Sequence, residues 1–159
     1  MEQKIGIHNM DMQKLQKELT FDEGCVYKIY NDHLGYATFG IGHLITEKDP
    51  EQGLPIDYPI SEERVTECFG DDIEGVCNDL DRNLSWWVGL SEDHQRVIAN
   101  MAFNLGINRL LKFKKFIKAM QESEFETAAK EMMDSRWATQ VGPRATRLRD
   151  RVLKGATDV

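Results

Sequence analysis

The chain has 159 residues, of which 41% are hydrophobic and 30% are charged, a composition typical of one soluble globular domain with its own core. No stretch approaches the roughly 18 consecutive apolar residues that a membrane-spanning helix needs, and no secretory signal is expected at the N-terminus. The three cysteines are too few for a disulfide framework. These features exclude a membrane protein, a disulfide-stapled secreted protein and a disordered chain.

Charge is distributed unevenly along the sequence. Residues 1–108 carry 8 Lys or Arg against 20 Asp or Glu, whereas residues 109–159 carry 12 against 7, and the whole chain has a net charge of −7. The acidic majority disfavours binding to polyanions, and the basic C-terminal third is expected to be a solvated helical surface. We therefore expect a monomer with no nucleic-acid partner and no membrane insertion.

The N-terminal half predicts one helix followed by strands. A helix is expected over residues 9–21, with Asn9 or Asp11 as its cap, and Gly24 is a natural stop after it. The runs KIY and YATFGI, separated by NDHLG, predict a β-hairpin. Residues 47–60 hold three of the four prolines and predict an ordered loop.

The second half predicts helices throughout. Ser61 is expected to cap a long connecting helix over residues 61–81. Ser91 is expected to cap the next helix, which stops at Gly106, and an apolar period from Leu110 to Met120 predicts another. A capping box of Ser123 and Glu126 predicts the start of a third, and Gly142-Pro143 precedes a last, basic helix. This order predicts an α+β, predominantly helical fold. A small lobe over about residues 22–60 would be joined by the connecting helix to a helical lobe over residues 82–159, on which the 9–21 helix packs, with a ligand cleft between the lobes.

Glu23 is the first candidate for a catalytic residue. It continues the apolar i+4 series of Leu15 and Leu19, so a carboxylate occupies the apolar stripe of its own helix. It also lies in the last turn, where the helix dipole disfavours negative charge. Both effects favour the protonated form that a general acid needs. A glutamate at a frayed end, pointing to solvent or paired with an arginine, is the alternative.

Asp32 and Thr38 follow at the hairpin. An aspartate in a turn usually bonds to the nearby backbone, but Asp32 is also placed to be a second, ionised carboxylate facing Glu23. Two carboxylates in different environments are what glycoside hydrolysis requires.

No metal or cofactor is expected. The four histidines show no HExxH pattern and no cysteine-paired spacing, which disfavours a zinc site. His43 is a possible ligand or base, although a structural histidine paired with Asp72 is the more common arrangement.

Residues 22–46, DEGCVYKIYNDHLGYATFGIGHLIT, closely resemble the T4-type phage lysozyme family. The DEG start, the KIY strand, the acidic turn, the threonine and the GIGHL segment all match, and Glu23, Asp32 and Thr38 fall at the family's catalytic spacing. The similarity continues through NMAFNLG (residues 100–106), SRW (residues 135–137), Gln140, Arg144 and Ala145, and it covers about residues 12–155.

This resemblance implies a two-lobed muramidase that hydrolyses the β-1,4 bond between N-acetylmuramic acid and N-acetylglucosamine in peptidoglycan, with inversion. It implies that Glu23 is the general acid and that Asp32 and Thr38 position and activate water. Supporting roles fall on Arg144 near the glutamate and on Asp72 paired with His43. The substrate-contact positions that it implies are Leu44, Phe103, Asn104, Phe116 and Glu131, of which the last three depart from the family's residue types.

The expected biological role is that of a phage endolysin. Such a protein would be made in the host bacterial cytoplasm and would reach the cell wall after holin-type release. A virion-associated or toxin-borne lysozyme, and a catalytically inactive wall-binding module, are the alternatives.

Overall fold

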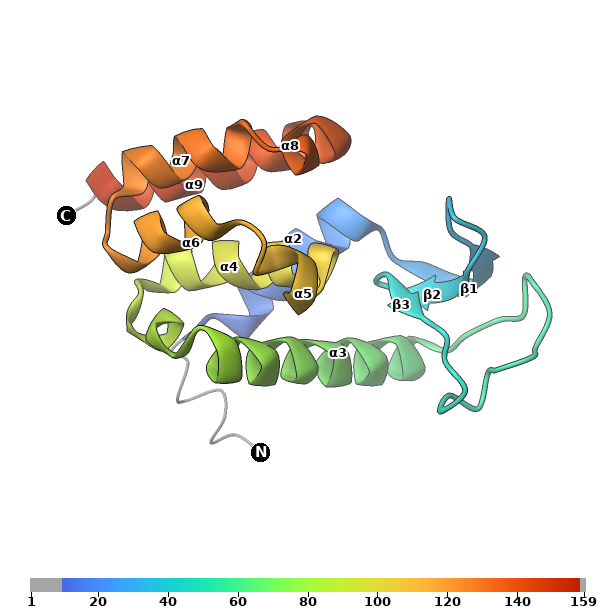
Figure 1. Ribbon diagram of the computed structural model, residues 1–159. Helices are drawn as coiled ribbons and strands as arrows, with labels where there is room; N and C mark the ends of the chain where they lie inside the picture. Colours follow the sequence, from blue (N-terminus) through green and yellow to red (C-terminus); the bar gives the residue numbers. More distant parts are fainter. Residues whose placement is uncertain (1–9, 158–159) are drawn as a thin grey trace. The chain divides into compact units, whose positions relative to one another are not determined.

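The computed structural model describes residues 10–157, with side chains described for residues 10–154. Helices and a small antiparallel sheet confirm the α+β, predominantly helical class (Figure 1). The chain divides into two compact units. The hairpin unit is Gln13–Gly75, and the helical unit is Met1–Met12 with Val76–Val159. Within the described residues, no helix combines the length and the apolar character needed to cross a membrane.

The first helix, α2, spans Met12–Glu23 and buries Leu15 and Leu19. It begins three residues later than predicted and extends two residues further. Asn9 lies outside the described residues, while Asp11 directly precedes the helix and donates its backbone N–H to Glu92.

The sheet has three strands in the order β1–β2–β3, which are Val26–Asn31, Ala37–Gly40 and His43–Leu44. The predicted hairpin corresponds to β1 and β2, whereas the short third strand was not predicted. It forms because the chain reverses directly after β2, so that Phe39 lies opposite His43 and Thr38 opposite Leu44. Two adjacent residues are too few to show an alternating pattern in sequence.

The loop after β3 is ordered, as its sequence predicts. It passes along β1, where the Ile29 N–H donates to the Tyr58 carbonyl oxygen at 3.0 Å and the Ile60 N–H to the Tyr27 carbonyl oxygen at 3.0 Å. Ile60 and Glu51 are buried. The loop therefore has partners for its backbone although it contains no helix or long strand.

Helix α3 covers Glu62–Asn83, close to the predicted 61–81. Ser61 caps it by accepting the Arg64 N–H at 3.1 Å, as predicted. The apolar stripe is buried at Val65, Phe69, Ile73 and Leu80. The division between the two units falls within this helix, at Gly75 and Val76.

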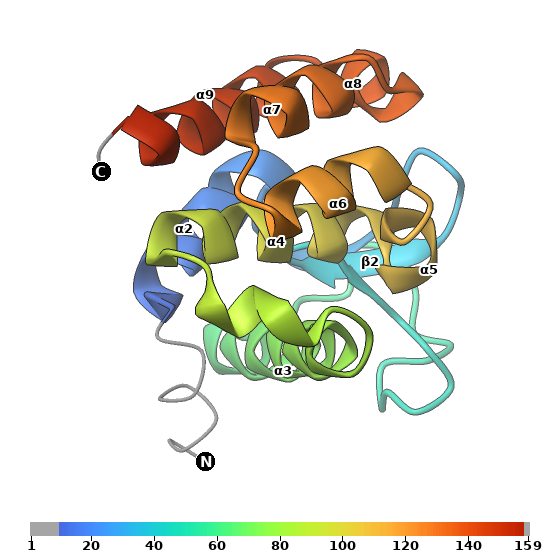
Figure 2. The ribbon, with the colours of Figure 1, turned by 60° about the vertical axis from the view of Figure 1, so that its left-hand side comes forward.

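The helical unit contains the remaining helices: η1 (Ser85–Gly89), α4 (Glu92–Leu105), α5 (Ile107–Leu110), α6 (Lys114–Gln121), α7 (Phe125–Met133), α8 (Arg136–Val141) and α9 (Pro143–Thr157). Helix α9 packs on α7, α4 and α8, and α7 lies alongside α9 in both ribbon views (Figures 1 and 2). The cap at Ser91, the stop at Gly106 and the start at Pro143 are as predicted.

Two local predictions in this unit are wrong. The apolar period from Leu110 to Met120 is interrupted, because α5 ends at Leu110 and α6 begins only at Lys114. The capping box of Ser123 and Glu126 is absent, since Glu124 is the N-cap of α7 and its side chain makes no capping hydrogen bond. Ser123 instead has a positive φ of 60°, and its N–H donates to Met120 while that of Glu124 donates to Ala119. This is a Schellman ending of α6, with a serine where glycine is usual.

Candidate functional site

Glu23 is the last residue of α2, so it lies in the last turn as predicted, and it is half-buried. The helix stops there because Gly24 takes φ +83° and donates its N–H to the Thr20 carbonyl oxygen at 2.8 Å. The glutamate side chain lies against the turn between β2 and β3, where a Cβ placed on Gly42 would be 3.1 Å from Glu23 Oε1. Gly42 is thus the residue whose missing side chain leaves room for this carboxylate.

Asp32 lies at the hairpin tip and is fixed by its own turn. Its Oδ1 accepts the N–H of Leu34 at 2.9 Å and of Tyr36 at 2.8 Å. The backbone closes the same turn, with the Asp32 N–H donating to the Tyr36 carbonyl oxygen at 2.9 Å. The common structural role of a turn aspartate is therefore present. Both of these side-chain bonds use Oδ1, and Oδ2 receives neither of them.

Thr38 is buried in β2, with 4% of its surface exposed. Its Oγ1 donates to the Tyr36 carbonyl oxygen at 2.9 Å. Because this bond uses the hydroxyl proton, the lone pairs of Oγ1 remain to accept a hydrogen bond.

Tyr30 lies opposite Thr38 in the β1–β2 pairing. Burial, and then the negative charges of Glu23 and Asp32, raise the pKa of Tyr30. The negative charges of both predicted carboxylates therefore raise the pKa of the same phenol within the hairpin unit. Tyr30 was not predicted from the sequence, although its place two residues before the turn aspartate, on the strand expected to pair with that of Thr38, was a signal for it.

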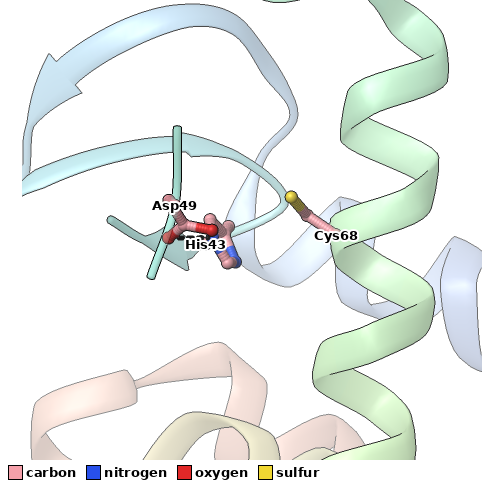
Figure 3. Close-up of side chains that lie close together, drawn as sticks. All are labelled: His43, Asp49 and Cys68. Carbon is pink, nitrogen blue, oxygen red and sulfur yellow. Dashed lines mark hydrogen bonds and ion pairs between the residues drawn. The ribbon is translucent and has the colours of Figure 1, made fainter. Parts of the chain in front are cut away.

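His43 is held between the carboxylates of Asp72 and Asp49, and Figure 3 shows its contact with Asp49. Its Nδ1 lies 2.8 Å from Asp72 Oδ2 and its Nε2 lies 3.0 Å from Asp49 Oδ2, so the expected partnership with Asp72 is present. The hydrogen bond with Asp72 is the main effect that raises the pKa of His43, and it outweighs the opposing effect of burial. Asp49 was not predicted, because its contact with His43 depends on the path of an irregular loop.

Asp49 belongs to a wider ionic network with Arg64. Arg64 Nη2 lies 3.2 Å from Asp49 Oδ1, and Arg64 Nε lies 2.8 Å from the buried Glu51. The hydrogen bond from Arg64 lowers the pKa of Glu51. For Asp49, burial alone would raise the pKa, but the hydrogen bonds from Thr46 and His43 lower it overall. These contacts fix the loop on the start of α3.

The remaining predicted residues are distributed over both units. Leu44 is exposed on β3 of the hairpin unit. In the helical unit, Arg144 is buried and its Nε donates to Asn100 Oδ1 at 3.0 Å. Phe103 is half-buried, and Asn104 Oδ1 accepts the indole N–H of Trp137 at 2.7 Å.

Phe116 and Glu131 share a pocket of about 440 Å³ in the helical unit. Phe116 is 1% exposed and forms part of the core, whereas Glu131 is half-buried. Lysine side chains give the pocket a positive side, and the lining residues are Lys112, Phe113, Lys114, Lys115, Phe116, Glu131, Asp134 and Ser135. Phe113 also contacts the Trp137 ring edge-on, with ring centroids 6.1 Å apart. The amide of Asn104 and one wall of the pocket are therefore linked through Trp137.

Comparison with known proteins gives consistent matches. The family described as phage lysozyme matches residues 21–154. The pre-baseplate central spike protein Gp5 of Enterobacteria phage T4 is 29% identical over 92% of this chain, which spans 28% of that protein's length. Two proteins of Dictyostelium discoideum, probable T4-type lysozymes 2 and 1, are 29% and 28% identical over 86% of this chain and 92% of their own length.

Proposed function

The chain belongs to the phage lysozyme family, and we propose that it cleaves the β-1,4 bond between N-acetylmuramic acid and N-acetylglucosamine of bacterial peptidoglycan with inversion at the anomeric carbon. The observation that carries this proposal is the combination of Glu23, Asp32 and Thr38 around the hairpin. Glu23 lies against Gly42, and Asp32 is fixed by its turn. The negative charges of both residues raise the pKa of Tyr30.

In this mechanism Glu23 donates a proton to the glycosidic oxygen as the bond breaks. Its position against Gly42 supports this role, because the glycine leaves one side of the carboxyl group without a side chain. Arg144 is proposed to support the glutamate, as the family resemblance implies.

Asp32 and Thr38 hold the attacking water. The two backbone N–H groups on Asp32 Oδ1 fix the carboxylate, and Oδ2 is then directed to accept a proton from water. Thr38 Oγ1, whose own proton is given to Tyr36, accepts the other water O–H. A water bound in this way presents its lone pair to the anomeric carbon, as an inverting reaction requires.

The test is digestion of purified peptidoglycan by the native protein and by Glu23→Gln and Asp32→Asn. We expect soluble products with muramic acid at the reducing end and inverted anomeric configuration. Each variant should lose about 10²–10⁴-fold in rate, the usual contribution of an acid or base. Matched controls are Glu47→Gln, an exposed loop glutamate, and Asp57→Asn, an exposed aspartate of the same unit; both should retain activity.

Failure of the native protein to release products, with binding to the wall retained, would contradict the proposal and favour a catalytically inactive wall-binding module. Products with the same anomeric configuration as the substrate would contradict the inverting mechanism alone.

We assign the enzyme the role of an endolysin, made in the host cytoplasm and acting on the wall after holin-type release. Lysis of an expressing culture should then require a membrane lesion, and lysis without any holin would contradict this role. A virion-associated lysozyme is the second candidate, because the T4 spike protein aligns with nearly the whole of this chain. Detection of the protein in purified virions would favour that candidate.

A further inference from the structure

The hairpin unit contains a second group of chemically active side chains that the proposed mechanism does not use. Among the described residues, a histidine nitrogen, an aspartate oxygen and a cysteine sulfur of His43, Asp49 and Cys68 all lie within 4.8 Å of one another. They come from three segments: strand β3, the loop that follows it, and helix α3. In Figure 3 the Cys68 sulfur projects from α3 toward the side on which His43 and Asp49 lie.

We propose that His43, Asp49 and Cys68 form a binding site for a zinc ion. The set of one imidazole, one carboxylate and one thiolate is typical of Zn²⁺ and unlike the all-oxygen sets of Mg²⁺ or Ca²⁺. Three protein ligands leave the fourth tetrahedral position for water.

The hydrogen bonds select the atoms that would bind the metal. Asp72 holds Nδ1 of His43 at 2.8 Å, which leaves Nε2 as the ligand. A carboxylate on the far nitrogen is the usual support for a zinc-bound histidine. Arg64 Nη2 holds Oδ1 of Asp49, while Oδ2 faces Nε2 at 3.0 Å. The cation of Arg64 is therefore bonded to the carboxylate oxygen that does not face the proposed metal position.

The site is enclosed but needs a small adjustment. The side chains of His43 and Asp49 are 12% and 14% exposed, and Cys68 is 3% exposed. Zinc binds nitrogen, oxygen and sulfur at about 2.0–2.3 Å, so its tetrahedral ligands lie roughly 3.3–3.8 Å apart. The three ligand atoms now lie within 4.8 Å of one another. Side-chain rotations that move them by about an ångström bring them to the separations that zinc requires.

The exchange of protons for metal conserves charge. Without metal, Nε2 of His43 lies at hydrogen-bond distance from Asp49 Oδ2, whereas zinc binds a histidine through a nitrogen that carries no proton and a cysteine as the thiolate. Binding one Zn²⁺ forms the bonds to nitrogen, oxygen and sulfur, and a proton on Nε2 of His43 and the proton of the Cys68 thiol are released to solvent. When both leave, the local net charge is the same before and after, so no unpaired buried charge is created.

No zinc site was expected from the sequence, because the proposed ligands form no zinc-binding motif. Positions 43, 49 and 68 have none of the short, regular spacings of zinc sites. The irregular loop brings the aspartate to the histidine, and α3 supplies the cysteine from its buried face.

The test is a titration of the full, reduced and EDTA-treated chain with Co²⁺ alone, followed by Zn²⁺. We expect a saturating thiolate-to-cobalt charge-transfer band with tetrahedral d–d absorption, displaced by Zn²⁺ at a one-to-one ratio. Zn²⁺ should also raise the Tm of the native protein. The absence of a charge-transfer band in the native protein would overturn the proposal without need of any variant.

Variants then identify the ligands. Cys68→Ser should lose the band and the Zn²⁺-dependent rise in Tm, whereas Cys77→Ser, a change at a buried cysteine of the same helix, should keep both. Asp72→Asn should weaken binding about 10–100-fold, as expected for loss of a carboxylate that supports a ligating histidine. Circular dichroism without metal checks that each variant is folded. A band that persists in Cys68→Ser, or disappears in Cys77→Ser, would overturn the assignment.

Discussion

His43 in the hairpin unit and His94 in the helical unit are fixed by opposite kinds of surroundings. His43 lies between two carboxylates, which raise its pKa. His94 is 2% exposed, and its Nε2 lies 3.0 Å from the Val152 carbonyl oxygen. The centroid of its ring lies 4.3 Å from that of the Phe125 ring. Burial lowers its pKa.

The two histidines join distant segments of the chain in two different ways. In the hairpin unit an ionic network connects β3, the following loop and α3. In the helical unit a neutral imidazole connects α4, α7 and α9 through one hydrogen bond and ring packing. The first arrangement depends on charge and the second depends on its absence, so the two should respond differently to substitution and to pH.

The largest effect is expected from Asp49→Ala in the ionic network. This change leaves His43, Arg64 and the Thr46 N–H without their shared acceptor. Removing one partner of a fully buried ion pair costs about 3–5 kcal/mol; we expect the lower end of that range, about 3 kcal/mol, because this pair is part-buried and Arg64 keeps its bond with Glu51. Urea unfolding with EDTA present measures it. Asp79→Ala, which breaks the exposed pair with Arg82, should cost less than about 1 kcal/mol; equal losses would contradict the comparison.

The next effect is expected from His94→Ala in the apolar surroundings. The substitution removes the ring that packs on Phe125 and leaves the buried Val152 carbonyl oxygen without this donor. An unsatisfied buried acceptor costs about 1–3 kcal/mol. Urea unfolding at neutral pH measures the loss. Added salt should leave it unchanged, whereas the Asp49→Ala loss should shrink; a salt-sensitive loss at His94 would show that charge contributes there.

A smaller effect is expected in the pH dependence of two asparagine variants. The raised pKa of His43 gives stability that is complete below its unfolded value and is lost as pH rises through the folded value. The destabilisation by His43→Asn should therefore shrink as pH rises above about 6.5. The lowered pKa of His94 gives stability that is complete above its unfolded value and is lost as pH falls, so the destabilisation by His94→Asn should shrink below about pH 6.5. Tm measured across pH with EDTA present tests both, and slopes of the same sign would refute the contrast.

The smallest effect concerns one backbone position in each unit. Ser123 in the helical unit and Asp57 in the hairpin unit both have positive φ, of 60° and 74°. Ser123→Gly should stabilise the protein by about 0.5–1 kcal/mol, because glycine adopts this conformation without strain. Asp57→Gly should gain less, since aspartate tolerates the conformation and its pair with Lys28 is lost. Thermal unfolding compares them, and a lower Tm for Ser123→Gly would show that the serine is not strained.

The features that the sequence predicted correctly are decided within a few residues. Ser61 and Ser91 cap helices because their hydroxyl groups reach an N–H three residues later. Gly24 ends α2 because the chain needs a left-handed residue there. Such choices depend on neighbours in the chain, and the residues that make them are visible in the sequence.

The features that were missed depend on competition or on distance. Ser123 satisfies the pattern of an N-cap for α7, but it is used to end α6, and sequence alone does not show which helix takes it. Asp49 and Arg64 meet only because an irregular loop returns to the start of α3. Of the candidate site, Glu23 and Asp32 were predicted from their places in the helix and the hairpin together with the family resemblance, whereas the second partner of His43 required the path of the chain.

The turn built on Asp32 has an evolutionary consequence. The carboxylate closes the hairpin through Oδ1 alone, and an asparagine side-chain oxygen accepts the same two N–H bonds. Under the proposed mechanism, Asp32→Asn would remove the base and leave the turn in place. A single substitution would therefore separate catalysis from folding at this position, and a lineage of non-hydrolytic wall-binding proteins could arise from this chain without passing through an unstable intermediate.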